Sequence, residues 1–175
     1  MKILFTGFNG FNNTSKVIVD KIKNDKLLFN NSYKEIDAQL VDINLEDYEL
    51  IIMLGLRSNL KKSIRLELNS SLNNELLFTN LNHYKLKKYF TDNTISCLVN
   101  DKPTDYLCNY AYHKVLKRNK KTIFIHLPNL KDIQDLDKLV KVISNINITT
   151  CIIWNVNSYF VVVIFLWKNF QASSI

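Results

Sequence analysis

The sequence predicts an α/β fold, a three-layer α/β/α sandwich around a mostly parallel, twisted central sheet. Short runs of apolar, β-prone residues alternate with longer segments in which apolar residues recur at helical spacing. Two of the runs, residues 2–6 and 49–56, are apolar almost throughout, as expected of strands buried on both faces of a parallel sheet. The length of 175 residues favours a single main domain.

The chain is expected to begin with a strand, a loop and a helix. Residues 2–6 predict a buried strand, and the glycines and asparagines of residues 7–13 predict a loop. A hydroxyl side chain at the end of this loop can cap the helix that follows. Phe8 and Phe11 lie in the loop, where they could form the wall of a flat apolar pocket or simply cover the core.

The remaining elements continue the alternation. In order, we expect a weaker strand at residues 35–43, an acidic turn at 42–49, a buried strand at 49–56, a basic loop at 57–62, an exposed strand at 63–68, a loop at 69–75, a helix at 81–90, a core strand at 94–99, a helix at 109–118, a core strand at 121–126 and a helix at 136–146. Apolar residues that alternate or run together predict the strands, and spacings of three and four predict the helices.

The C-terminal part differs in composition, so we expect one domain at residues 1–147 and an apolar tail at 148–175. The tail contains nine consecutive apolar β-formers at residues 159–167. This run is much shorter than the roughly 20 residues that a membrane-spanning helix needs. It predicts an extra buried strand or an interface segment, and no membrane association.

Composition narrows the class of protein. The net charge is +7, but the lysines are scattered in pairs and short clusters, as on a solvated surface, so we expect no nucleic-acid partner. Cys97, Cys108 and Cys151 form no CxxC pair and no cluster with histidine, so we expect no metal or other cofactor. An odd number of cysteines without disulfide spacing favours a reducing compartment, and the N-terminus becomes polar too soon for a signal peptide. We therefore expect a cytoplasmic protein.

One cysteine and one histidine occupy positions suited to a nucleophile and its general base. Cys108 follows the turn signal at residues 101–105 and stands at the head of the predicted helix 109–118, where the helix dipole favours a thiolate. His126 ends the predicted strand 121–126. Such a pair could carry out nucleophilic catalysis. The residues alone leave a second interpretation open, in which the cysteine is a small buried hydrophobe and the histidine has a structural role.

Four stretches of the chain resemble the pyroglutamyl peptidase I (pyrrolidone-carboxylate peptidase) family of cysteine peptidases. They are MKILFTGFNGF at residues 1–11, the strand 51–55 followed by IRLE at 64–67, YLCNY at 106–110, and IFIHLP at 123–128. They also occur in the order of the family. The resemblance implies an exopeptidase (a hydrolase and thiol protease) that removes N-terminal pyroglutamate from peptides, uses no cofactor and forms a homo-oligomer.

The same resemblance implies roles for individual residues. Cys108 would attack the carbonyl of the pyroglutamyl residue, and His126 would take the thiol proton and later protonate the leaving amine. Glu67 would orient the imidazole and stabilise its cation. Backbone N–H groups at the helix start would hold the oxyanion. The residues that would contact the substrate are Phe8, Phe11 and Leu107.

Some loops of the family have no counterpart in this chain, and this leaves alternatives open. Lys61 stands near the place of a family arginine, and a lysine does not reproduce the planar fork of that side chain. The segment after Glu67 is shorter than in the family, so Glu75, or no carboxylate, could face His126 instead. A catalytically inactive member that acts as a structural or binding protein is therefore a second hypothesis. A basic RNA-binding module is a third, suggested by the net charge alone.

Overall fold

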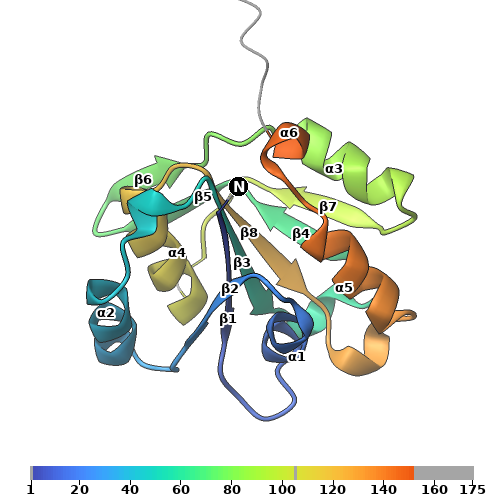
Figure 1. Cartoon of the computed structure of the whole chain (residues 1–175), viewed down its shortest axis with the longest axis horizontal. Coiled ribbons are helices and arrows are strands. Elements are labelled where there is room, and N and C mark those ends of the chain that lie inside the picture. The colour runs from blue at the N-terminus through green and yellow to red at the C-terminus, as the bar shows by residue number, and fades with distance from the viewer. Residues whose placement is uncertain (1, 105, 152–175) are drawn as a thin grey trace, which may run out of the picture.

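A six-stranded sheet in the order β2-β1-β3-β8-β4-β7 forms the centre of the protein (Figure 1). The structure, a computed structural model, describes residues 2–104 and 106–151. The strands of this sheet are β1 (Ile3–Phe8), β2 (Asp25–Phe29), β3 (Leu50–Leu56), β4 (Ile64–Glu67), β7 (Cys97–Asn100) and β8 (Thr122–Leu127). Only the β4–β8 pair is antiparallel among the neighbouring strands of the sheet. The predicted mostly parallel sheet is therefore confirmed.

Helices cover both faces of the sheet, and the three-layer α/β/α sandwich is also confirmed. The helices α1 (Thr14–Lys21), α3 (His83–Asp92) and α5 (Leu136–Ser144) pack on one face, and α2 (Tyr33–Val41) and α4 (Leu107–Arg118) pack on the other (Figure 1). Strand β3 shows why two cores result. Its residues Leu50, Ile52 and Leu54 belong to the first core, and Ile51 and Met53 belong to the second, because side chains alternate across a strand.

The predicted strand at residues 35–43 is wrong, since this segment forms α2. The Ser32 hydroxyl caps the helix by accepting a hydrogen bond from the backbone N–H of Glu35, and it donates one to the Glu35 carboxylate. Ile36 and Leu40, one turn apart, bury the inner side of the helix. The strand of this region is β2, which the sequence analysis missed because its first half is exposed and charged.

The segment at residues 69–75, expected to be a loop, belongs to a two-stranded hairpin of β5 (Asn69–Leu72) and β6 (Glu75–Phe78). Asn73 and Asn74 turn the hairpin with φ of 50° and 64°, the left-handed region that asparagine tolerates better than most residues. The strand at residues 63–68, which precedes the hairpin, was expected to be exposed. It forms β4, which is largely buried inside the sheet, with β7 and β8 paired on its two sides.

The described chain ends in α6 (Ile148–Cys151), a helical turn that contacts α3. The backbone N–H of Asn82 donates to the carbonyl of Cys151 at 2.7 Å, so these first residues of the expected tail pack on the domain. The apolar run at residues 159–167 lies outside the described residues. Within the described ranges, no helix has both the length and the apolar character needed to cross a membrane.

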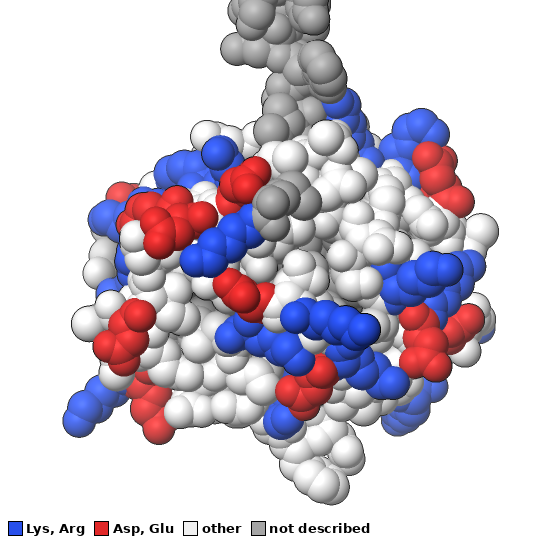
Figure 2. All heavy atoms as spheres, in the orientation of Figure 1, with Lys and Arg blue, Asp and Glu red and all other residues white. Residues whose placement is uncertain are grey.

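Charged side chains of both signs are interspersed on the surface. Figure 2 shows lysines and arginines next to aspartates and glutamates over the face in view. Several form surface ion pairs, such as Lys88 with Asp92 at 2.9 Å and Arg118 with Glu46 at 3.0 Å. On this face the positive charges do not gather into one continuous patch.

Candidate active site

The carboxyl ends of β3 and β8, the two central strands of the sheet, place the predicted histidine. His126 is buried, and Gly55 of β3 and Arg65 of β4 are its partners on either side. A Cβ atom at Gly55 would lie 2.6 Å from Cζ of Phe124 and 3.2 Å from Cδ2 of His126. Glycine at this position therefore leaves the space that the imidazole and the neighbouring phenyl ring occupy.

Helix α4 brings the predicted nucleophile to this histidine. The helix begins at Leu107, with Tyr106 at its N-cap, so Cys108 lies in its first turn, on the side of the sheet that α4 covers. The Sγ atom of Cys108 is 3.5 Å from Nε2 of His126, within the range of a hydrogen bond to sulfur. Cys108 is half-buried, which leaves part of its surface open to solvent.

The third predicted residue, Glu67, completes the group. Nδ1 of His126 lies 2.6 Å from Oε1 of Glu67, and both side chains are at most 5 % exposed. Nε of Arg65 donates to the same oxygen at 2.6 Å, and the Asn100 amide donates to the other oxygen, Oε2, at 2.6 Å. The hydroxyl of Tyr112 holds the backbone carbonyl of Glu67 at 3.1 Å. Contacts from three elements thus fix the position of the carboxylate.

Glu75, the alternative carboxylate, lies elsewhere. Its Oε2 is 3.1 Å from Nε2 of His113 and 2.9 Å from Nζ of Lys117, both on α4. This contact ties the β5–β6 hairpin to the helix. It is therefore Glu67, and not Glu75, that faces His126.

Arg65 and Asn100 were not expected from the sequence. Arg65 stands two residues before Glu67 on the same strand, a spacing that places both side chains on one face of β4. That spacing was a usable signal once Glu67 was a candidate. Asn100 ends β7, whose pairing with β4 brings it opposite Glu67. Only the strand order could have revealed this second contact.

The surroundings of Glu67 favour its ionised form. Burial alone would raise the pKa of this carboxyl. The hydrogen bonds from His126 and Asn100 and the charge of Arg65 outweigh burial, so the pKa lies below the ordinary value of 4.5. At neutral pH the residue is an anion that accepts hydrogen bonds on both oxygens.

The state of the Cys108 thiol differs from the expectation of a depressed pKa. Burial raises the pKa of Cys108 above the ordinary value of 9.0, and the nearby charge of Glu67 raises it further. The backbone N–H of Asn109 and the charge of Arg57 lower it without reversing the direction. A helix N-terminus is thus not sufficient to hold a thiolate here, because this thiol is partly withdrawn from water.

Within the described residues, the hydrogen bonds of the two other cysteines are to Leu98 and Thr150, and not to a histidine. Both cysteines are buried in the apolar core, and burial raises the pKa of Cys97 to about 12 and that of Cys151 to about 11. All three cysteines are free. Cys108 is the one that lies beside a histidine.

A cavity of about 320 Å³ opens above the Cys108–His126 pair. The residues that line it are Leu56, Arg57, Ser58, Asn59, Tyr106, Cys108 and His126. Arg57 follows β3 directly, and its backbone N–H donates to the carbonyl of Leu127 at 2.8 Å. The lining is therefore mixed, with an arginine, a serine and an asparagine beside apolar surface.

The three residues expected to contact the substrate do not line this cavity. Phe8 is the last residue of β1 and packs in the core, with its ring centroid 5.6 Å from that of Phe29. Phe11 is 97 % exposed. Leu107 packs against the core beneath α4. Phe8 and Phe11 thus form no sandwich for a flat ring, because strand β1 extends further than expected and turns Phe8 inward.

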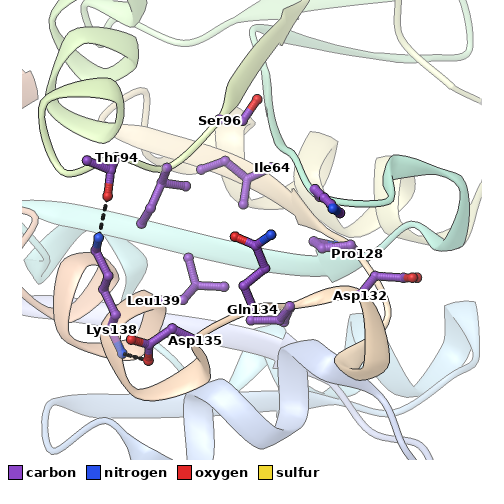
Figure 3. Close-up of a pocket in the computed structure, with 12 residues that line it drawn as sticks. Ile64, Thr94, Ser96, Pro128, Asp132, Gln134, Asp135, Lys138 and Leu139 are labelled. Atoms are coloured by element: carbon purple, nitrogen blue, oxygen red, sulfur yellow. Dashed lines mark hydrogen bonds between the residues drawn. The ribbon is translucent and has the colours of Figure 1, made fainter.

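A second hollow of about 200 Å³ lies between α5, the start of β4 and the residues just before β7 (Figure 3). Gln134 projects into it, and Lys138 forms a hydrogen bond with Thr94 across one side. Its lining contains no cysteine and no histidine. Nothing in it resembles the group at Cys108. Among the described residues there is also no cluster of three or more side chains suited to hold a metal ion.

Comparisons with known proteins identify the fold. The chain is similar to the pyrrolidone carboxyl peptidase of Thermus thermophilus, with a TM-score of 0.68 and 19% identity over 81% of this chain and 96% of that one. For pyroglutamyl peptidase I of Bacillus amyloliquefaciens the TM-score is 0.67, with 18% identity over 81% of this chain and 90% of that one. For the pyrrolidone carboxyl peptidase of Fervidobacterium islandicum the TM-score is 0.67, with 18% identity over 82% of this chain and 94% of that one.

No model of a known protein family matches the chain, and a search of curated proteins found no match. The structural similarity therefore establishes one point: this α/β/α domain has the fold of the pyrrolidone carboxyl peptidases. Within that fold, the chain places Cys108 within hydrogen-bond distance of His126, and His126 within hydrogen-bond distance of Glu67.

Proposed function

We propose that the protein is a cysteine peptidase that removes N-terminal pyroglutamate from peptides. One observation carries the proposal, the continuous contact from Sγ of Cys108 through the imidazole of His126 to the carboxylate of Glu67. A nucleophile, a base and a group that orients the base are what acyl transfer from an amide requires. The shared fold and the four sequence stretches of the family support the choice of substrate.

In the proposed reaction, His126 Nε2 takes the thiol proton as Cys108 Sγ attacks the amide carbonyl. Glu67 accepts a hydrogen bond from Nδ1–H, which leaves Nε2 free to act as the base and stabilises the imidazolium that forms. Backbone N–H groups in the first turn of α4 would stabilise the oxyanion. The imidazolium then protonates the leaving amine, and water hydrolyses the thioester to release the acid and restore the thiol.

Proton transfer during attack fits the raised pKa of Cys108. Because burial disfavours a standing thiolate, Cys108 rests as a thiol, and its Sγ–H can donate to Nε2 of His126. His126 would then act as the general base that takes this proton during the attack.

A binding or structural role is the second candidate, and one specific observation favours it. The cavity at Cys108 lacks the two phenylalanines that the family resemblance implies, since Phe8 lies in the core and Phe11 is exposed. A protein of this kind would keep the fold and the three polar residues without turning over pyroglutamyl peptides. Assembly into a homo-oligomer and a cytoplasmic location stay predictions under either function.

The test is hydrolysis of a pyroglutamyl aminomethylcoumarin amide under reducing conditions by wild type, Cys108→Ser and Cys97→Ala. We expect activity in wild type, loss in Cys108→Ser and retention in Cys97→Ala, because Cys97 lies in the core away from His126. Circular dichroism should show each variant to be folded. Full activity in Cys108→Ser, or none in folded wild type, would contradict the proposal, and the latter result would favour the binding role.

A further inference from the structure

Arg57 lines the cavity that contains Cys108, and its charge acts on the proposed nucleophile. Two backbone hydrogen bonds fix the residue at the carboxyl edge of the sheet: its N–H donates to the Leu127 carbonyl at 2.8 Å, and its carbonyl accepts from the N–H of Leu60 at 3.2 Å. The side chain is half-buried. Arg57 therefore occupies a defined position beside the thiol.

No carboxylate pairs with Arg57 in the described part of the chain. Its Nε donates to the neutral Oδ1 of Asn59 at 3.0 Å, and no salt bridge involves it. The other arginines of the described chain, Arg65 and Arg118, each form an ion pair with a glutamate. Since a guanidinium has five N–H donors arranged as a fork, Arg57 keeps donors available for an anion that enters the cavity.

The rest of the lining supports a polar ligand. Ser58 and Asn59 present further hydrogen-bonding groups. Phe8 and Phe11, the two rings expected around a neutral lactam, do not line the cavity, whose aromatic side chain besides the imidazole is the phenol of Tyr106. Arginine recognises carboxylates in a bidentate manner, which adds geometric selectivity as well as energy. A cavity with a thiol at one side and an uncompensated guanidinium at another is suited to amides that carry a carboxylate near the reacting carbon.

We propose that Arg57 binds a carboxylate that lies next to the scissile amide, so that the preferred substrates are short acidic ones. This inference rests on the proposed function and narrows it: among pyroglutamyl substrates, a dipeptide with a free C-terminal carboxylate is preferred over its C-terminal amide. Arg57 is then a specificity residue that contacts substrate.

The direct test compares alkylation of Cys108 by iodoacetate and by iodoacetamide, two reagents of nearly equal size that differ in charge. Both consume the same thiolate, so the ratio of their rates cancels any change in the pKa of Cys108. We expect Arg57→Gln to lower the iodoacetate-to-iodoacetamide ratio at least about tenfold. Lys62→Gln, which removes the same charge from a residue that lines the other hollow, should leave the ratio within about twofold.

Two results would overturn the inference. One is an unchanged ratio in Arg57→Gln, which would mean that Arg57 does not hold the carboxylate. The other is an equal fall in Lys62→Gln, which would indicate only the general field of the basic surface. Because both reagents also alkylate ordinary thiols, the ratio can be measured even if Cys108 is not catalytic.

A second experiment separates this inference from the proposed function. Wild type and Arg57→Gln are compared on pyroglutamyl-alanine and on pyroglutamyl-alanine amide. We expect wild type to cleave the free acid faster in kcat/KM and Arg57→Gln to lose most of that preference. If wild type cleaves both substrates equally, the carboxylate site at Arg57 is contradicted, but the proposed function is not. If folded wild type cleaves neither, the proposed function is contradicted, and the alkylation ratio alone decides whether Arg57 binds a carboxylate.

Discussion

Oε1 of Glu67 lies 2.6 Å from Nδ1 of His126, and the antiparallel pairing of β4 with β8 accounts for the contact. In that pair Arg65 stands directly opposite His126, and Glu67 stands opposite Phe124. Residues opposite one another in an antiparallel pair share a face. Arg65, Glu67 and His126 therefore meet on one side of the sheet, where α4 delivers Cys108.

The ionised state of Glu67 should make stability depend on pH. Its folded-state pKa is depressed, so the stability that it contributes is fully present above its ordinary value of 4.5 and is lost as the pH falls through the lower folded value. Glu67→Gln leaves the largely buried Arg65 without its charged partner and should cost about 3 kcal/mol near neutral pH.

Urea unfolding of wild type and Glu67→Gln at about pH 7 and about pH 3 measures this effect. We expect the difference between the two proteins to shrink markedly at the lower pH, where the wild-type carboxyl begins to take up a proton. A difference of the same size at both values would mean that the charge of Glu67 does not stabilise the fold.

Arg65 should act as a positioning residue through Glu67. In Arg65→Met the carboxylate loses one of its charged partners, so its pKa should rise, and the acid limb of the pH–rate profile should move to higher pH. Turnover should fall by roughly tenfold, the scale of one lost hydrogen bond to a charged group. The matched change Arg118→Met removes an arginine that pairs with the exposed Glu46. An acid limb that moves equally in both variants would exclude a specific role for Arg65.

Gly55 should be necessary for the position of the imidazole. In Gly55→Ala the new Cβ would lie 2.6 Å from Cζ of Phe124 and 3.2 Å from Cδ2 of His126, so these rings must shift. We expect a loss of about 1–3 kcal/mol in the free energy of unfolding and a fall in turnover per folded molecule. Thr91→Ala, at an exposed position on α3 away from the cavity, is the control. If Gly55→Ala keeps wild-type turnover, catalysis does not depend on the exact position of the His126 imidazole.

The three cysteines should differ in their reaction with iodoacetamide. Cys108 is half-buried and should be alkylated first, whereas Cys97 and Cys151 are buried, with pKa values of about 12 and about 11, and should react only on unfolding. Because burial raises the pKa of Cys108, its rate should still be rising at the ordinary value of 9.0. Peptide mapping after alkylation at increasing pH measures both effects. A rate for Cys108 that is constant from about pH 6 to about pH 8 would indicate a standing thiolate instead.

Local patterns were sufficient to predict most of the fold. The strands around residues 49–56 and 121–126 are mostly apolar, and both lie at the centre of the sheet. The error at α2 arose because the apolar residues of this segment were interpreted as a strand, although Ser32 and Glu35 carry the signature of a helix start. The hairpin at residues 69–78 was missed because its alternation of polar and apolar side chains is weak.

The site could be predicted only in part, for a related reason. Cys108 and His126 stand at the ends of strongly patterned elements, so the residues themselves identified them as candidates. Glu67 came from the family resemblance, and its contact with His126 depends on β4 running antiparallel to β8, which no local pattern encodes. Asn100 was not expected because its neighbour in space, Glu67, is distant in sequence.

The central claim is that Cys108 is a nucleophile that His126 activates, and trapping of the acyl-enzyme tests it most directly. Wild type, Cys108→Ala and His126→Ala would be mixed with an activated pyroglutamyl ester, quenched with acid within the first turnover, and mapped by mass spectrometry. The account predicts a pyroglutamyl group on the peptide that contains Cys108 in wild type, none there in Cys108→Ala, and much slower acylation in His126→Ala. A folded wild type that forms no adduct, or one that carries it on another residue, would contradict the account.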